Sequence, residues 1–215
     1  NVSFKYPGAD QPVLQNISFI AKPGQTTAFI GSTGSGKSTI INLIPRFFDI
    51  TSGEILIDGI NIQDITQAEL HYKIGFVPQK SILFSGTIES NIKFGTESTS
   101  ENELESSAKI SQSYDFIQKL NEKFDAPVSQ GGTNFSGGQK QRLSIARALI
   151  VNPEIYIFDD SFSALDFKTD KVLREQLKKV TSKSTVLIVA QRIGTILDAD
   201  QIIVLEEGKI VGVGN

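Results

Sequence analysis

Residues 31–38 read Gly31-Ser32-Thr33-Gly34-Ser35-Gly36-Lys37-Ser38, a stretch that fits the pattern G-x-x-x-x-G-K-[ST]. A short apolar run, Thr26 to Ile30, precedes it, and apolar residues at helical spacing follow it as far as Pro45. This order of strand, glycine-rich loop and helix is the context in which the pattern has structural meaning. A flexible Gly/Ser loop would contain the same residue types, but it would not need the flanking strand and helix. The stretch therefore predicts an α/β fold built around this loop.

The residue types in this loop predict the binding of phosphate groups. Glycines let backbone N–H groups close around phosphate oxygens without side-chain clashes, and the start of the following helix adds favourable partial charge. In such a loop Lys37 reaches the β- and γ-phosphates, while the hydroxyl of Ser38 is placed to bind Mg²⁺. We expect the segment that contacts the nucleotide to run from Gly31 to Thr39.

A second candidate site lies further along the chain. Ile155 to Phe158 form an apolar run of strand length, and the pair Asp159-Asp160 ends it. In P-loop enzymes an aspartate at the end of a buried strand holds Mg²⁺, which makes Asp159 the candidate for the Walker B position. A solvated turn aspartate is the alternative. The loop and the aspartate together predict a P-loop NTPase without saying which kind.

The composition narrows the classes of function. The 215 residues include 21 Lys and Arg against 24 Asp and Glu, and this net charge of −3 gives no basic field for nucleic acid or anionic lipid. The absence of cysteine excludes disulfides and thiolate chemistry, and the single histidine, His71, is expected to be solvated. No apolar run approaches the roughly 18–20 residues of a membrane span. The lack of methionine leads us to expect a domain trimmed from a longer chain.

Strands and helices are predicted to alternate along the chain. The predicted strands lie at 2–6, 17–20, 26–30, 55–57, 74–77, 155–158 and 185–190, with a terminal hairpin at 202–205 and 209–213. Helices are predicted up to Pro45, at about 138–151 and at about 171–180, and the polar segment 96–133 has apolar residues at helical spacing. Such alternation indicates an α/β core with a largely parallel sheet and a mostly helical insert.

The most specific motif stands between the two candidate sites. Residues 134–139 read Asn134-Phe135-Ser136-Gly137-Gly138-Gln139, and the string Lys-Gln-Arg-Leu-Ser-Ile-Ala-Arg-Ala-Leu follows. A glycine turn that merely starts a helix does not explain this whole string. The segment resembles the signature motif of the nucleotide-binding domains of ABC transporters, in the position expected between phosphate loop and Walker B strand. The resemblance covers essentially all 215 residues.

This resemblance implies a fold. It implies the ABC-ATPase form of the P-loop NTPase fold, with a mainly parallel core sheet and an N-terminal antiparallel β region. It further implies one domain over 1–215, with the catalytic core at 1–80 and 140–215 and a helical subdomain at about 81–139 that includes the signature motif. The string Leu83-Phe84-Ser85-Gly86-Thr87-Ile88 is similar to the multidrug and lipid exporter branch of the family.

The resemblance also implies site residues and cofactors. ATP and Mg²⁺ are the implied cofactors, with Tyr6 stacking on the adenine; by itself Tyr6 would be read as core or edge-strand packing. Gln79, in Phe-Val-Pro-Gln, matches the Q-loop glutamine, which faces Mg²⁺ and the coupling interface. Mg²⁺ is thus expected at Ser38, Gln79 and Asp159. The D-loop is matched by Ser163-Ala164-Leu165-Asp166.

Two residues depart from the family pattern in the same half-site. The residue after the Walker B aspartate is usually a glutamate that activates water; here it is Asp160, and pulling a carboxylate back by roughly 1 Å can cost about 10²-fold in rate. The switch position, usually histidine, is Gln191, which can donate a hydrogen bond but cannot become a cation. We expect Asp160, Gln191 and Gln79 to be the catalytic residues of an ABC-type ATPase that is weak or inactive as an isolated domain.

The family pattern also implies a partner chain. In the family two domains bind ATP head to tail, so Ser136 and Gly138 would contact ATP held by a second chain. The two departures, together with Gln130 where exporter homodimers tend to carry glutamate, resemble the degenerate-site subunit of a heterodimeric exporter. We expect a second half-transporter and a transmembrane domain, absent from this fragment, as partners on the cytoplasmic side of the cell membrane. Neither nucleic acid binding nor membrane insertion of the fragment is expected.

Two other classes of function stay open. Non-transport ABC ATPases usually carry tandem ATP domains or coiled-coil insertions, and no heptad pattern is sustained here. A regulatory nucleotide-binding module without a competent site in its assembly is the other alternative. A transmembrane domain in the whole protein would exclude the first, and ATPase activity of the assembly would exclude the second.

Overall fold

The computed structural model describes residues 1–96 and 98–215, excluding the side chains of Ile193 and Thr195. Its strands are β1 (Val2–Phe4), β2 (Leu14–Ile17), β3 (Thr26–Gly31), β4 (Leu56–Ile57), β5 (Ile60–Asn61), β6 (Ile74–Val77), β7 (Gly86–Thr87), β8 (Pro127–Val128), β9 (Ile155–Asp159), β10 (Thr185–Val189), β11 (Gln201–Glu206) and β12 (Lys209–Gly214). Its α-helices are α1 (Lys37–Leu43), α2 (Gln67–Tyr72), α3 (Ile88–Ile92), α4 (Glu101–Ile110), α5 (Tyr114–Ile117), α6 (Gly137–Ile150), α7 (Phe167–Val180) and α8 (Ile193–Ile196). Two short 3-10 turns are η1 (Lys123–Asp125) and η2 (Gln130–Gly132).

The central sheet has the strand order β12-β11-β3-β10-β9-β6. The pairs β11–β3, β3–β10, β10–β9 and β9–β6 are parallel, and only the edge strand β12 runs antiparallel. The predicted parallel core is therefore confirmed. Because parallel strands end at the same edge of the sheet, the loop after β3 and the acidic end of β9 lie at one edge, separated by β10.

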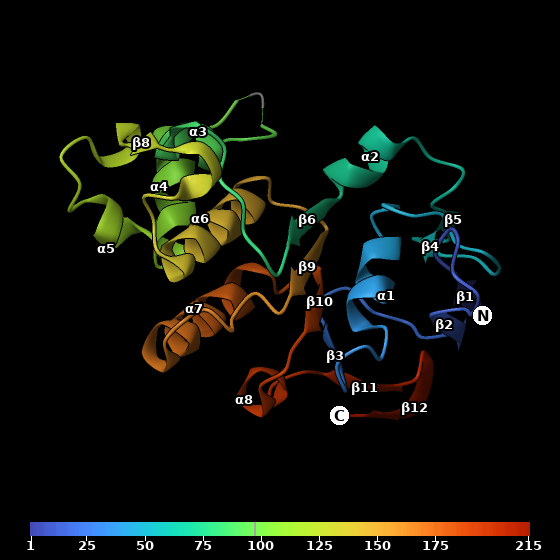
Figure 1. Cartoon of the computed structure of the whole chain (residues 1–215). Coiled ribbons are helices and arrows are strands. Elements are labelled where there is room, and N and C mark those ends of the chain that lie inside the picture. Colours follow the sequence, from blue (N-terminus) through green and yellow to red (C-terminus); the bar gives the residue numbers. More distant parts are fainter. Residues whose placement is uncertain (97) are drawn as a thin grey trace.

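Helices cover both faces of this sheet. Helix α1 lies on one face, while α6 and α7 lie on the other (Figure 1). The first face is closed by a cluster that includes Phe29, Ile41 and Ile157, all buried. The second is closed by a cluster in which Leu149 of α6 and Leu173 of α7 pack with the sheet residues Tyr156, Phe158 and Ile188. The near-continuous burial of β9 follows from this covering on both sides.

Antiparallel strands flank the N-terminal part, as expected from the family resemblance. Strands β1 and β2 pair antiparallel, and so do β4 and β5. The strand predicted at 17–20 was wrong, because the strand spans Leu14–Ile17 instead. Leu14 and Ile17 are the residues that enter the core, whereas Ile20 keeps 75% of its surface exposed.

The predicted helical insert is confirmed, and it has a core of its own. Helices α3, α4 and α5 gather with α6 beside the sheet (Figure 1). Ile88, Leu104 and Ile117, one from each of these three helices, are buried together with Leu143 and Ala146 of α6. The signature helix α6 thus belongs to two cores, because Ile145 and Leu149 face the sheet cluster. The boundaries of the subdomain at about 81 and 139 stay a prediction.

Several short elements had no counterpart in the prediction. They are β5, the β7–β8 pair, α2 and α8, whereas the strand predicted at 55–57 is found as β4. Helix α2 begins with a capping box in which Thr66 and Glu69 satisfy each other's backbone N–H groups. Helix α7 starts at Phe167, earlier than predicted, because Asp166 caps it by accepting from the N–H of Thr169. Of the helices that the structure describes, none combines the length and apolar character needed to cross a membrane.

Candidate nucleotide-binding site

The phosphate loop joins the end of β3 to the start of α1, as the sequence predicts. Gly36 precedes the helix with φ 101°, a left-handed conformation that favours glycine. A Cβ at Gly36 would lie 2.6 Å from Cδ2 of Leu14, and one at Gly31 would lie 2.1 Å from the carbonyl oxygen of Leu205. Both glycines are therefore required by close approach as well as by conformation.

Lys37 projects into the loop that precedes it. Its ammonium group donates to the carbonyl oxygens of Gly31 at 2.9 Å and Ser32 at 2.7 Å, and to Oγ of Ser35 at 3.3 Å. Burial lowers the pKa of Lys37, while the negative charges of Asp159 and Asp160 act in the opposite direction. The site thus holds a partly desolvated cation over the loop, which suits an anionic ligand.

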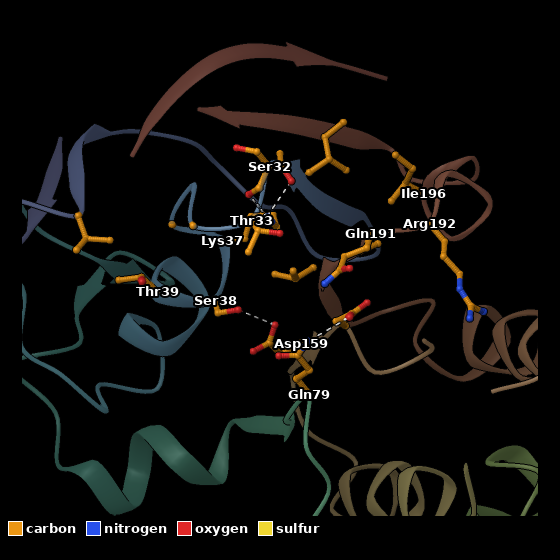
Figure 2. A pocket seen from close by; sticks show the side chains of 18 residues that line it. Ser32, Thr33, Lys37, Ser38, Thr39, Gln79, Asp159, Gln191, Arg192 and Ile196 are labelled. Carbon is orange, nitrogen blue, oxygen red and sulfur yellow. Dashed lines mark hydrogen bonds between the residues drawn. The ribbon is translucent and has the colours of Figure 1, made fainter. Parts of the chain in front are cut away.

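Asp159 ends β9 and faces the start of α1. Its Oδ1 accepts a hydrogen bond of 3.0 Å from Oγ of Ser38 (Figure 2). Burial raises the pKa of Asp159, since removal from water disfavours the charged form, and the hydrogen bond from Ser38 acts in the opposite direction. A carboxylate and a hydroxyl at this separation are oxygen donors of the kind that Mg²⁺ takes from P-loop proteins.

Asp160 lies beside this pair and is also buried, with 8% of its surface exposed. Its backbone adopts a left-handed conformation, φ 45°, which aspartate tolerates better than most residues. Its Oδ2 accepts a hydrogen bond of 3.3 Å from Nε2 of Gln79, the residue expected at the Q-loop position. The structure thus joins two of the predicted catalytic residues directly.

The predicted residues surround one cleft of about 610 Å³. Those that line it are Gly31, Ser32, Thr33, Gly34, Gly36, Lys37, Ser38, Thr39, Gln79, Asp159, Asp160 and Gln191. Figure 2 shows the amide of Gln191 directed into the cleft on the side of Asp159, whereas Arg192 extends away from it. The cleft also has lining residues that the sequence did not assign to the site, which are Val13, Ile30, Val189, Ala190, Arg192 and Ile196.

Two residues expected at the nucleotide take supporting positions. Ser35 is buried and accepts from Lys37, while its N–H donates to the carbonyl of Ser32, so it shapes the loop from within. The ring of Tyr6 packs edge-on against Phe4 and Phe48 at centroid distances of 4.7 and 5.2 Å. The hydroxyl of Tyr6 shares a hydrogen bond of 3.2 Å with Oγ1 of Thr39. Tyr6 therefore lies next to the cleft and is hydrogen-bonded to Thr39, the last residue of the predicted nucleotide-binding segment.

His71 lies outside this cleft. Its ring is at the surface, yet Nε2 is 2.7 Å from the carbonyl oxygen of Pro45 and the ring packs against Phe47. The prediction of a merely solvated histidine was thus incomplete, because the ring makes a specific contact to the chain that follows α1.

The signature residues start α6, away from the cleft. Ser136 caps the helix by accepting from the N–H of Gln139 at 3.2 Å, and the side chain of Gln139 accepts from the N–H of Ser136 at 2.9 Å. The side chain of Asn134 holds the preceding loop, since it accepts from the N–H of Ser129 and donates to the carbonyl oxygen of Pro127. Phe135 is buried in the core of the helical insert. Gly137 has open space where a Cβ would stand. Among the described residues that line the cleft, none belongs to 134–139.

The D-loop, residues 163–166, connects the cleft with α7. The hydroxyl of Ser163 donates to the backbone carbonyl of Asp160 at 2.9 Å, and Asp166 caps α7. Arg192 reaches the same loop and donates to the carbonyl oxygens of Ser163 at 2.8 Å and Leu165 at 3.4 Å. Sequence reasoning missed Arg192; the only signal available was its place directly after Gln191.

Comparison with known families decides the identity of the fold. The profile of the ABC transporter family matches residues 14–163, which include the phosphate loop, the signature residues and Asp159. The chain belongs to the ABC transporter family. Within that family it is an ATP-binding domain of the ABC-ATPase type, with the mixed α/β fold expected from the sequence.

Similar proteins place this domain among longer chains. An uncharacterized ABC transporter ATP-binding protein of Mycobacterium tuberculosis is 48% identical over 215 residues, which cover 99% of this chain and 37% of the relative. An ATP-binding/permease protein of Staphylococcus aureus, provisionally named for multidrug export, is 46% identical over 214 residues, covering 100% of this chain and 37% of its own. A solved structure of a bacterial Atm1-family ABC exporter with ATP bound matches with a TM-score of 0.96 at 40% identity, again over 100% and 37% of the two chains. The chain thus spans about 37% of the length of these relatives.

Proposed function

We propose that this ABC domain is the ATP-binding motor of a membrane exporter that holds Mg-ATP firmly in its own cleft and hydrolyses it weakly there. The exporter assignment is supported by the Staphylococcus aureus relative named for multidrug export and by the ATP-bound exporter of the same fold. The observation that carries the proposal is the contrast within one cleft: the groups that hold phosphate and metal are intact, and the pair beside them is altered.

The binding half of the cleft fits Mg-ATP. Lys37 supplies a partly desolvated cation, and the first N–H groups of α1 have no partner within the helix, so both can meet phosphate oxygens. Ser38 and Asp159 would hold Mg²⁺ through their oxygens, with Gln79 facing the same space. When bound, Mg²⁺ neutralises charge on the β- and γ-phosphates.

The altered half of the cleft lacks the groups that activate water. Asp160 is one methylene shorter than glutamate, and its carboxylate accepts from Gln79, which draws it towards the Q-loop. Gln191 can donate to a phosphate oxygen, but it carries no charge that could stabilise the developing negative charge of the transition state. We therefore expect the nucleotide to be oriented and retained with little hydrolysis.

The signature residues serve a second chain in this proposal. Ser136 and Gly137 are exposed and lie away from the chain's own cleft, so the ATP that they contact would be held by a partner half-transporter. The partner would supply the intact catalytic pair, which makes the assembly a heterodimer with one degenerate site. The domain would act on the cytoplasmic side of the membrane, joined to transmembrane helices outside this chain.

Restoring the family residues tests this proposal. The wild-type chain should bind Mg-ATP in equilibrium dialysis and show little turnover. D160E/Q191H should bind with similar affinity and, in the assembly with its partner, turn ATP over faster, by about 10²-fold if each change restores roughly tenfold. Robust hydrolysis by the wild-type chain would sink the weak-site proposal. Tight binding with no gain from the double change would show that another residue limits hydrolysis.

A further inference from the structure

The D-loop is held between two parts of the molecule that serve different ATP sites. On one side Arg192 forks onto the loop, with Nη2 2.8 Å from the carbonyl oxygen of Ser163 and Nη1 3.4 Å from that of Leu165. On the other side the signature helix approaches so closely that a Cβ at Gly138 would lie 3.2 Å from the carbonyl oxygen of Ala164. Three consecutive carbonyl groups of one loop thus face either Arg192 or the signature helix.

The Arg192 side of the loop continues into the nucleotide cleft. Arg192 directly follows Gln191, whose amide points into the cleft while the Arg192 side chain points away from it (Figure 2). A second connection is the hydroxyl of Ser163, which donates to the backbone carbonyl of Asp160 at 2.9 Å. A displacement of Asp160 by bound nucleotide would therefore act on the D-loop through the hydrogen bond from Ser163, and a displacement of Gln191 would act on it through the adjoining Arg192.

A second arginine braces the same unit. Arg174 of α7 donates to the backbone carbonyl of Gly194 at 2.9 Å, which ties α8 to the helix that follows the D-loop. Arg174 is itself held by Asp170, which is 4% exposed, through a bond of 3.0 Å from Nε to Oδ1. The segment after Gln191 is thus fixed to α7 as well as to the D-loop, and the three parts should move together.

We propose that Arg192 is a positioning residue that couples occupancy of this chain's own cleft to the conformation of its signature end through the D-loop. The proposal rests on the binding of Mg-ATP proposed above. Lysine could not replace Arg192 fully, because a guanidinium presents several donors in a fixed fork and an ammonium group acts as a compact point charge. The pair of carbonyl acceptors at Ser163 and Leu165 matches that fork.

This coupling gives a degenerate cleft a purpose. An ATP that is held and seldom hydrolysed would keep Gln191, Arg192 and the D-loop in one arrangement, and Gly138 would keep the signature end in register with it. The signature end would then be presented to the partner's ATP while this chain's own nucleotide stays bound. Coupling of this kind requires that these contacts have two arrangements whose equilibrium is shifted by the bound nucleotide.

Hydrogen–deuterium exchange of the chain with and without Mg-ATP tests the coupling. The three hydrophobic clusters are each formed by residues of this chain, so the chain is tested by itself. Light scattering should confirm that it is a monomer at the concentration used. In the wild type, Mg-ATP should slow exchange at 31–39, 163–166 and 136–140. In R192Q, protection should persist at 31–39 and be lost at the other two segments, with R192K intermediate. R46Q is the control, since Arg46 pairs with Asp49 on the surface.

Each other result overturns a specific part of the account. Wild-type protection at 163–166 and 136–140 in R192Q would overturn the role of Arg192. Loss of protection at 31–39 in R192Q would make Arg192 a binding residue and would also overturn it. Protection of only 31–39 in the wild type would overturn the coupling but leave the proposed function standing. No protection at 31–39 in the wild type would overturn the proposed ATP binding together with the coupling.

Discussion

The nucleotide cleft and the signature end of α6 are built in opposite ways. The cleft buries its charges, since Lys37, Asp159 and Asp160 each keep less than a tenth of their surface exposed, and each of these side chains is hydrogen-bonded within the chain. The signature end is open: Ser136 and Gly137 are exposed, and the hydroxyl of Ser136 only caps its own helix. The cleft can therefore hold a ligand by itself, whereas the signature end is an open surface that can contact a ligand held by another chain.

Because of this difference, the cleft should bind nucleotide by itself, whereas the signature end should complete the nucleotide site of a second chain. A ligand in the cleft replaces the contact that Lys37 makes within the loop and the contact that Ser38 makes with Asp159, so its affinity depends on this chain alone. At the signature end a hydroxyl and a helix start are offered without a surrounding pocket, so their effect should appear only when a second chain brings its nucleotide. Substitutions in the two regions should therefore give different phenotypes.

The largest effect is expected from S136A in the assembled transporter. Loss of a donor to transferring phosphate should reduce turnover at the partner's site by about 10²-fold, the scale found when one transition-state donor is removed. ATP affinity at this chain's own cleft should not change. Turnover of the assembly and binding of a fluorescent ATP analogue to this chain report the two quantities.

The matched control for this substitution is S100A. Ser100 caps α4 through the same kind of capping box with Glu103, so both substitutions should cost roughly 1 kcal/mol of helix-cap stability. S100A should leave turnover of the assembly unchanged. Equal losses of turnover in the two variants would mean that Ser136 acts only as a cap.

The next effect is expected at Lys37. Removing its ammonium group in K37A should weaken ATP binding to the isolated chain by roughly 10- to 100-fold, since hydrogen bonds to charged groups contribute about 1.5–3 kcal/mol. Titration calorimetry measures the affinity, with K73A as the control because Lys73 pairs with Glu154 on the surface. An unchanged Kd in K37A would place the nucleotide elsewhere.

The cleft could be predicted from the sequence far better than its internal contacts. Residues 31–38 predict a phosphate-binding loop because the backbone conformations of such a loop are local and require glycine, as the left-handed conformation does at Gly36. The bond between Gln79 and Asp160 joins positions 81 apart, and no local pattern encodes it. The contact of Arg192 with Ser163 is of the same kind, since it depends on the order of β9 and β10 in the sheet.

The fold shows the same division. The buried strand at 155–158 and the helix after the signature motif were predicted because their apolar residues are continuous or periodic. The strand at 17–20 was misplaced because Leu14 and Ile20 are equally apolar and flank Ile17 at the same spacing, and only packing decides that Leu14 is buried and Ile20 exposed. Short elements such as α8 and β5 lack the length for a periodic signal.

A smaller gain is expected from D160E alone. The longer side chain should carry the carboxylate beyond Gln79 towards the attacking water and raise turnover at this site by about 10-fold, less than the double change, because Gln191 still lacks a charge. The assay should measure the ADP that forms in the cleft of this chain. A turnover unchanged by D160E but raised by Q191H would identify the switch position as the limiting group.

The smallest effect concerns stability without nucleotide. Because burial raises the pKa of Asp159, its ionisation opposes folding, and D159N should raise the Tm by a few degrees, as about 1 kcal/mol shifts a domain of this size by about 2–4 °C. The folded pKa lies above the ordinary value of about 3.9, so the carboxyl's contribution to stability is complete below that value and is lost as the pH rises through the folded pKa. The advantage of D159N should grow across that window in thermal melts. A lower Tm for D159N at pH 7 would contradict the assigned cost of the buried charge.

The fate of ATP held by this chain inside the assembly tests most directly whether its cleft binds the nucleotide and hydrolyses it only weakly. The partner's phosphate loop would be disabled, so that labelled nucleotide binds only in the cleft of Lys37, and bound ATP and ADP would be quantified over time. We expect the ATP to be retained and recovered largely unhydrolysed, while D160E/Q191H in the same assembly converts it to ADP. Conversion to ADP by the wild-type chain at the rate of the double variant would contradict this expectation.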